Sequence, residues 1–190
     1  MPLYFIYPIY TGTLAILTFV VVPRREIQRL GIYAIFFGGV FDIFNIILFT
    51  KVIGIGGYIN FRPFGAFGIP FFPPMAWTAY FILFIYMLPK RSPWKYLFPS
   101  VAAGYSTFFS HVLQELGIFK WNWGSPLFHF LIFIVWHYAV WWAYSKVSQN
   151  STELSSKPKH SFRIKRPPSP AFAKKPKLKK LINLKRLKHW

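Results

Sequence analysis

Residues 3–25 have the sequence LYFIYPIYTGTLAILTFVVVPRR, in which 20 uncharged residues are followed by a proline and two arginines. About 20 apolar residues, each rising ~1.5 Å, cross the ~30 Å hydrocarbon core of a bilayer. This stretch therefore predicts a membrane-spanning helix over residues 3–22. A cleavable signal peptide carries basic residues before its apolar run. Here the first charged residue is Arg24, which favours an uncleaved first helix with its N-terminus outside.

Further apolar stretches of similar length follow along the chain. They predict helices over residues 30–50, 71–88, 96–118 and 126–144. The chain is 54% hydrophobic and only 14% charged, whereas a soluble domain carries about 25% charged residues. The predicted fold class is therefore all-α: a polytopic membrane helix bundle over residues 1–145 with five transmembrane helices. A bundle of four such helices is the alternative.

Lys and Arg are distributed unevenly among the segments that connect these helices. With five spans, three follow the first helix, three follow the third and 14 follow the fifth. The alternate segments hold only Lys51, Arg62 and Lys120. Basic segments of membrane proteins stay in the cytoplasm. The distribution predicts a multi-pass protein of the cell membrane with its N-terminus outside and its C-terminus cytoplasmic.

Residues 146–190 form a segment of different composition, with 14 of the 23 Lys and Arg of the chain. We expect a disordered, polybasic cytoplasmic tail. Nucleic acid is not an expected partner, because the tail has few aromatic rings on which bases could stack. Anionic lipid headgroups are the expected partner. The residues expected to bind them are Lys174, Lys175, Lys177, Lys179, Lys180, Lys185, Arg186 and Lys188.

The segment between the second and third predicted helices, residues 52–70, holds five glycines and two prolines. A regular helix is not expected there. One interpretation is an outer loop at the membrane interface. The other is a re-entrant segment buried among the helices, since non-helical backbone at membrane depth must be enclosed by protein or water.

Polar side chains are rare in the predicted spans and are therefore candidates for a functional site. If the predicted helices are correct, several of them lie at a similar depth in the outer half of the membrane. The candidate polar site consists of Asp42, Asn45, His111, Gln114, Glu115 and His129.

Three interpretations of this set are open. The side chains form interhelical hydrogen bonds, or they form a binding or proton-transfer site, or the two histidines and the carboxylates bind a transition metal. No cofactor is expected. The chain has no cysteine and no HExxH, GxSxG, P-loop or GxGxxG pattern, so an enzyme is not indicated.

Small residues also recur on one face of the second predicted helix, at Gly31, Ala34 and Gly38. Small side chains allow helix backbones to approach closely in a membrane. We therefore expect another helix to pack against this face.

Three motifs in residues 30–145 resemble one known family. They are the acid-bearing stretch 38–42 (GGVFD), the proline-rich helix start 69–77 (IPFFPPMAW) and the stretch 110–126 (SHVLQELGIFKWNWGSP). The chain is similar in these motifs to an uncharacterised family of small multi-spanning membrane proteins from spore-forming Gram-positive bacteria. The resemblance implies a membrane protein and a bacterial host but no catalytic residue, and the basic tail is not part of the family pattern.

These observations leave several functions open. The leading hypothesis is a non-enzymatic membrane scaffold, sensor or assembly partner, with a second copy or another membrane protein as its partner. One alternative is a small transporter or lipid-binding protein that uses a polar pocket around Asp42, His111 and Glu115. Another is a metal-dependent enzyme that acts on lipids within the membrane.

Overall fold

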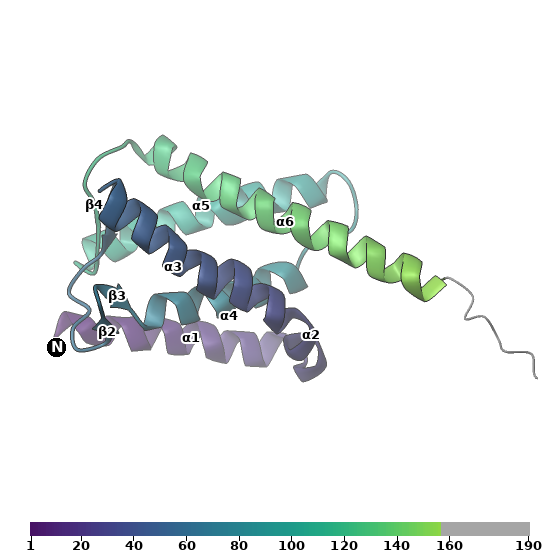
Figure 1. Ribbon diagram of the computed structural model, residues 1–190, viewed down its shortest axis with the longest axis horizontal. Coiled ribbons are helices and arrows are strands. Elements are labelled where there is room, and N and C mark those ends of the chain that lie inside the picture. The colour runs from purple at the N-terminus through teal and green to yellow at the C-terminus, as the bar shows by residue number, and fades with distance from the viewer. Residues whose placement is uncertain (157–190) are drawn as a thin grey trace, which may run out of the picture. The chain divides into compact units, whose positions relative to one another are not determined.

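The computed structural model describes the backbone of residues 1–156 and the side chains of residues 1–148 (Figure 1). The eight basic residues expected to bind lipid headgroups, 174–188, lie outside this part of the chain, as does most of the predicted tail. A short 3₁₀ turn, η1 (Leu3–Phe5), leads into helix α1 (Ile6–Val21). Together they match the predicted first helix. The helix ends where Val22 adopts an extended conformation ahead of Pro23, as expected for a residue that precedes proline.

The second helical stretch is longer than predicted and begins directly after Pro23. It runs without interruption through α2 (Arg24–Ala34), η2 (Ile35–Val40), α3 (Phe41–Asn45) and η3 (Ile46–Val52). Proline suits the start of a helix for two reasons. Its missing N–H would have no partner within the helix there, and its fixed φ is close to the helical value. Both η2 and η3 are π-helical, and they flank the short α3 that carries Asp42.

Three further helices correspond to the remaining predicted spans. They are α4 (Phe72–Tyr86), α5 (Trp94–Glu115) and α6 (Pro126–Ser156). As expected, prolines occupy the first turn of α4. Helix α6 continues for 12 residues beyond its predicted end at residue 144, because polar residues can extend a helix that the apolar span has already nucleated.

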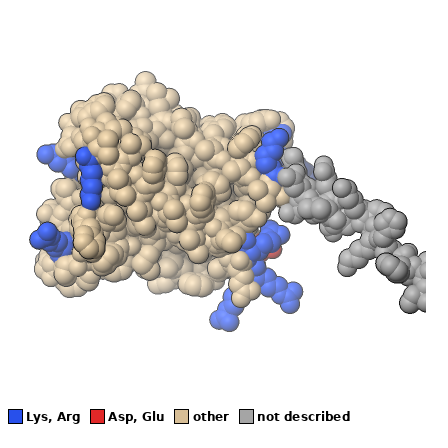
Figure 2. Space-filling view, viewed as in Figure 1, with Lys and Arg blue, Asp and Glu red and all other residues tan. Residues whose placement is uncertain are grey.

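The chain is thus mostly helical in its described part, and three helical stretches are long and apolar enough to cross a membrane. These are Leu3–Val21, Arg24–Val52 and Pro126–Ser148; helix α4 is apolar but shorter. On the face shown in Figure 2, Lys and Arg gather at two opposite ends of the described helices, and the surface between them carries neither. This arrangement is the one expected of helices surrounded by hydrocarbon.

Helix α4 lies at the centre of the packing and contacts α1, α2 and η2. Gly38 makes its close approach possible, because a Cβ atom there would lie 2.6 Å from the carbonyl oxygen of Trp77. Ala34 is fully buried, in agreement with the predicted small-residue face. Gly31 does not contribute to this contact, because a Cβ atom there would have no neighbour within 4 Å.

Two short strand pairs join the helices at the end of the bundle that also holds the N-terminus (Figure 1). Strand β1 (Gly56–Tyr58) pairs antiparallel with β4 (Phe119–Trp121), and β2 (Gly65–Ala66) pairs with β3 (Ile69–Pro70). No helix forms between η3 and α4, as expected. The pairing of β1 with β4 was not predicted, because it joins segments more than 60 residues apart.

Candidate functional site

The six polar side chains predicted to share one site are divided among separate places. Asp42 and Asn45 line one small cavity, while His111, Gln114 and His129 lie beside Trp121, whose indole also forms part of the wall of that cavity. Glu115 is exposed. Its separation follows from the helix boundary, because α5 ends at Glu115 and not at residue 118 as predicted.

His111 and His129 form a pair, and one of them, His129, packs against the indole ring of Trp121. The ring of His129 stacks on it with a centroid distance of 3.6 Å and an interplanar angle of 11°. His129 Nδ1 lies 3.4 Å from Nε2 of His111, and its Nε2 lies 3.2 Å from the carbonyl oxygen of Trp123. The backbone N–H of Trp121 donates to Gln114 Oε1 at 3.2 Å. These contacts tie β4 to α5 and α6, which is the role of interhelical hydrogen bonding.

A metal site is not supported by this geometry. Among the residues that the structure describes, no three His, Asp or Glu side chains come together in a group that could hold a metal ion. The two histidines lie together, but Glu115 and Asp42 do not complete a ligand set with them.

Asp42 has a different environment from the other five residues. Its side chain is 4% exposed, and its Oδ2 atom has no hydrogen-bond partner. It lines a cavity of about 70 Å³ together with Asn45, Tyr58 and several aromatic rings. Short π-helical segments within α-helices often occur at functional sites, and Asp42 lies between two of them.

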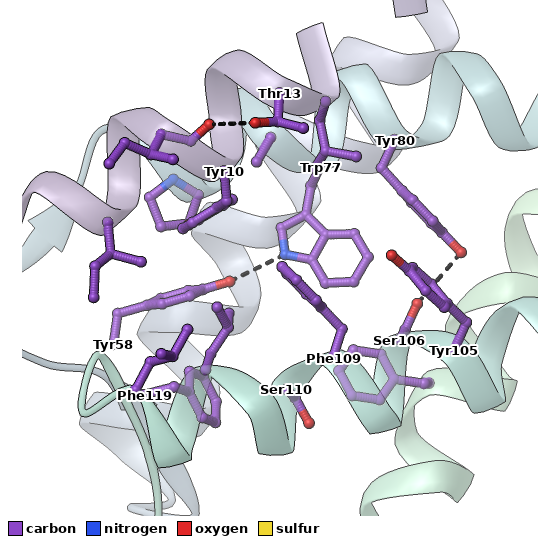
Figure 3. A pocket seen from close by; sticks show the side chains of 18 of the residues that line it. Tyr10, Thr13, Tyr58, Trp77, Tyr80, Tyr105, Ser106, Phe109, Ser110 and Phe119 are labelled. Carbon is purple, nitrogen blue, oxygen red and sulfur yellow. Dashed lines mark hydrogen bonds between the residues drawn. The ribbon is translucent and has the colours of Figure 1, made fainter. Parts of the chain in front are cut away.

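A larger cavity of about 410 Å³ lies between α1, α4 and α5 (Figure 3). The sequence analysis did not predict it. Along α1 its wall extends from Ile6 to Leu17, and α5 contributes residues such as Phe109. Tyr58 and Trp77 line both this cavity and the Asp42 cavity, so the two share part of one wall. The Trp77 indole N–H donates to the Tyr58 hydroxyl oxygen at 3.1 Å, which fixes the position of both rings.

A chain of hydrogen bonds borders the larger cavity and reaches into the core. His137 is fully buried, and its Nδ1 lies 2.8 Å from the carbonyl oxygen of Phe133. If Nδ1 donates there, Nε2 is left to accept from the Tyr80 hydroxyl at 2.9 Å. Ser106 in turn donates to the Tyr80 oxygen at 3.3 Å. The site predicted from the sequence did not include His137, Tyr80 or Ser106. A histidine in the middle of an uncharged span was the signal that could have indicated them.

Tyr10 contributes a buried polar atom to the wall of the larger cavity. Its hydroxyl is buried and makes no hydrogen bond within the described part of the chain. Most buried hydroxyl groups are paired, so an unpaired one beside a cavity marks a position where a ligand atom can bond.

Comparison of the chain with protein-family models, with curated proteins and with solved structures gives no match. The resemblance of residues 30–145 to a family of spore-forming bacteria therefore stays a prediction.

Proposed function

We propose that this protein is a non-enzymatic integral membrane protein that holds the apolar chain of a lipid in the cavity between α1, α4 and α5. The cavity itself is the observation that carries the proposal. Its volume of about 410 Å³ lies within the ~300–1,000 Å³ typical of small-molecule sites. Its walls are mainly aliphatic and aromatic side chains.

The position of the cavity along α1 favours a lipid over a water-soluble ligand. Its wall spans 11 residue steps from Ile6 to Leu17, or about 17 Å along the helix axis at the usual rise. This is about half the ~30 Å thickness of the hydrocarbon core. Because the stretch Leu3–Val21, which contains α1, is long and apolar enough to cross a membrane, the molecules nearest the cavity would be lipid chains.

The outer surface of the helices agrees with a lipid environment. Large apolar side chains are strongly exposed there, for example Val20 at 78%, Ile32 at 71% and Phe36 at 59%. Contiguous apolar surface of this kind is unfavourable in water and normal against hydrocarbon. The polar atoms at the cavity, chiefly the Tyr10 hydroxyl, suit the ester or hydroxyl group of an amphiphile.

The proposal includes the finer topology predicted from the sequence. All five helical stretches cross the membrane, with the N-terminus outside and the C-terminus in the cytoplasm. Helix α4, which is apolar but shorter than the other spans, crosses among its neighbours, with residues such as Phe81 and Phe84 buried. Helix α5 crosses with apolar side chains such as Val101 and Phe108 exposed towards the lipid. The basic residues of 146–190 then lie at the inner leaflet, where each Lys or Arg contributes about 1 kcal/mol of attraction to anionic headgroups.

A photoactivatable lipid with its reactive group in the acyl chain tests the lipid-binding function. In the reconstituted protein, crosslinks should map to peptides of α1, α4 and α5 that line the cavity. Leu14→Trp replaces an aliphatic side chain on the cavity wall with a larger, aromatic one. If the indole displaces about two methylene groups at ~0.8 kcal/mol each, affinity for the chain falls roughly tenfold.

The matched control is Ile16→Trp. Ile16 lies two residues away on α1, does not line the cavity and is 66% exposed. It should leave the crosslinking pattern unchanged. Equal labelling of the parent and Leu14→Trp at cavity peptides would show that the lipid sits on the outer surface of the helices and would overturn the proposal.

A further inference from the structure

Asp42 is a buried acid without a hydrogen-bond partner, and the residues around it indicate what kind of ligand could neutralise its charge. In the part of the chain that the structure describes, the only ion pair joins Arg29 to Glu26, and no basic side chain pairs with Asp42. An ionised carboxylate in apolar surroundings costs several kcal/mol unless a proton or a cation neutralises it. The position is well inside the second helical stretch, ten residues before its end at Val52.

The cavity beside Asp42 has room for a small ligand. Its volume is about 70 Å³, whereas one water molecule needs about 10–15 Å³ measured in this way. Asn45 and Thr50 contribute polar groups to the wall. The Thr50 hydroxyl is already committed, since it donates to the carbonyl oxygen of Gly56 at 2.8 Å.

Three tryptophans line this cavity, and the N–H of each is engaged elsewhere. The indole of Trp77 donates to Tyr58, that of Trp121 to Ser110 Oγ at 3.3 Å, and that of Trp136 to the carbonyl oxygen of Phe37 at 3.1 Å. The tryptophans therefore offer ring carbon surface to the cavity and no hydrogen-bond donor to the carboxylate. Trp is the aromatic side chain that attracts cations most strongly.

One carboxylate surrounded by aromatic rings selects a particular kind of cation. Divalent metal ions require several oxygen ligands, and no cluster of three His, Asp or Glu occurs among the described residues. An ammonium group instead needs one counter-charge and favourable contact with ring faces, which is how quaternary ammonium ions are recognised in proteins.

We propose that Asp42 and the rings of Tyr58, Trp77, Trp121 and Trp136 form a binding site for an organic ammonium cation. The carboxylate neutralises the charge, and the rings contact the N-alkyl groups. The cation is either a free amine or the amine headgroup of a lipid, since both present the same group. This site does not require a lipid chain in the larger cavity, so either proposal can fail alone.

Binding of tetramethylammonium and methylammonium to the full-length protein in detergent tests the site. Intrinsic tryptophan fluorescence is a direct readout, because three of the eight tryptophans line the cavity. We expect a saturable change in fluorescence and a rise in thermal stability with each cation. Asp42→Asn keeps the shape of the side chain, removes its charge and should weaken binding at least roughly tenfold. Glu115→Gln, which removes an exposed carboxylate, is the matched control and should bind as the parent does.

A second measurement keeps the test decisive if Asp42→Asn fails to fold. The neutral isostere 3,3-dimethylbutanol has the shape of choline without its charge, and it should bind the parent at least roughly tenfold more weakly than choline does. Absence of saturable binding by the parent would overturn the proposal and leave Asp42 neutralised by a proton. Equal binding of sodium and tetramethylammonium would also overturn it, because the rings would then contribute nothing.

Vesicle composition distinguishes the two sources of the ammonium group. The parent is reconstituted in phosphatidylglycerol alone or with added phosphatidylethanolamine. If the headgroup occupies the site, the apparent affinity for tetramethylammonium falls as the fraction of phosphatidylethanolamine rises. If the affinity stays constant, the ligand is a free amine.

Discussion

Substitution of Gly38 by alanine should push α4 away from η2 and destabilise the protein. The added Cβ would lie 2.6 Å from the carbonyl oxygen and 2.7 Å from the carbonyl carbon of Trp77, and 2.8 Å from the amide nitrogen of Thr78. All three are backbone atoms, so no side-chain rotation relieves the contact. Ordinary carbon contacts lie at about 3.5–4.0 Å, which means that the two backbones must separate by roughly 1 Å. Overpacking of this kind costs about 1–3 kcal/mol.

Gly31→Ala on the same helical stretch isolates this steric cost. A Cβ at Gly31 meets nothing within 4 Å, so only the usual helix gain of about 0.5–1 kcal/mol remains. Because both variants share that gain, the difference between their free energies of unfolding is the steric cost of about 1–3 kcal/mol. Denaturant titration of the purified protein, followed by tryptophan fluorescence, measures it. Equal stabilisation by both substitutions would refute the close packing of α4 on η2.

Three further predictions concern the core, the topology and the tail. Tyr80→Phe removes the hydroxyl that bonds to the buried histidine of α6 and should lower the free energy of unfolding by about 1 kcal/mol. Tyr105→Phe removes a hydroxyl from a side chain that is 54% exposed and should leave the free energy of unfolding unchanged. Equal effects of the two substitutions would contradict the buried network. With no native cysteine, Lys120→Cys should react with an impermeant maleimide in intact cells and Lys90→Cys only after permeabilisation; the reverse pattern would invert the topology. A peptide of residues 174–190 should bind phosphatidylglycerol vesicles and detach as salt rises, whereas equal binding to neutral vesicles would show that its leucines dominate.

The helices were predictable because each contains an apolar run bounded by charge or proline, although only three of the helical stretches are long and apolar enough to cross a membrane. Pro23 with the two arginines after it marked the first boundary well, and the prolines at the start of α4 marked another. The end of α6 was predicted 12 residues too early. The composition changes from apolar to polar at residue 146, whereas the helix continues to Ser156. A change from apolar to polar residues locates the membrane surface, which is a different property from the end of hydrogen bonding along a helix.

The two cavities were not predictable, because their walls come from segments that are distant in sequence. Tyr58 reaches both cavities only because β1 pairs with β4, with Tyr58 opposite Phe119. The Tyr7 hydroxyl holds this pair on α1, at 2.6 Å from the carbonyl oxygen of Ile59 and 2.5 Å from that of Ile118. A loop of glycines gives no periodic signal from which such a pairing could be read.

The rarity of polar residues in an apolar span selected six candidate side chains, but it could not separate structural bonds from a binding site. That distinction depends on whether each buried polar atom has a partner. His129 and Gln114 have partners within the protein, and these bonds explain their presence in the membrane. Glu115 is exposed and needs no explanation. Asp42 is the member of the predicted set that the fold buries and leaves unpaired, beside a cavity lined by rings whose N–H groups are already used. An ionised carboxylate in that position costs several kcal/mol unless it is neutralised. Either a proton or a bound ammonium cation removes that cost, and the binding experiments described above decide between the two.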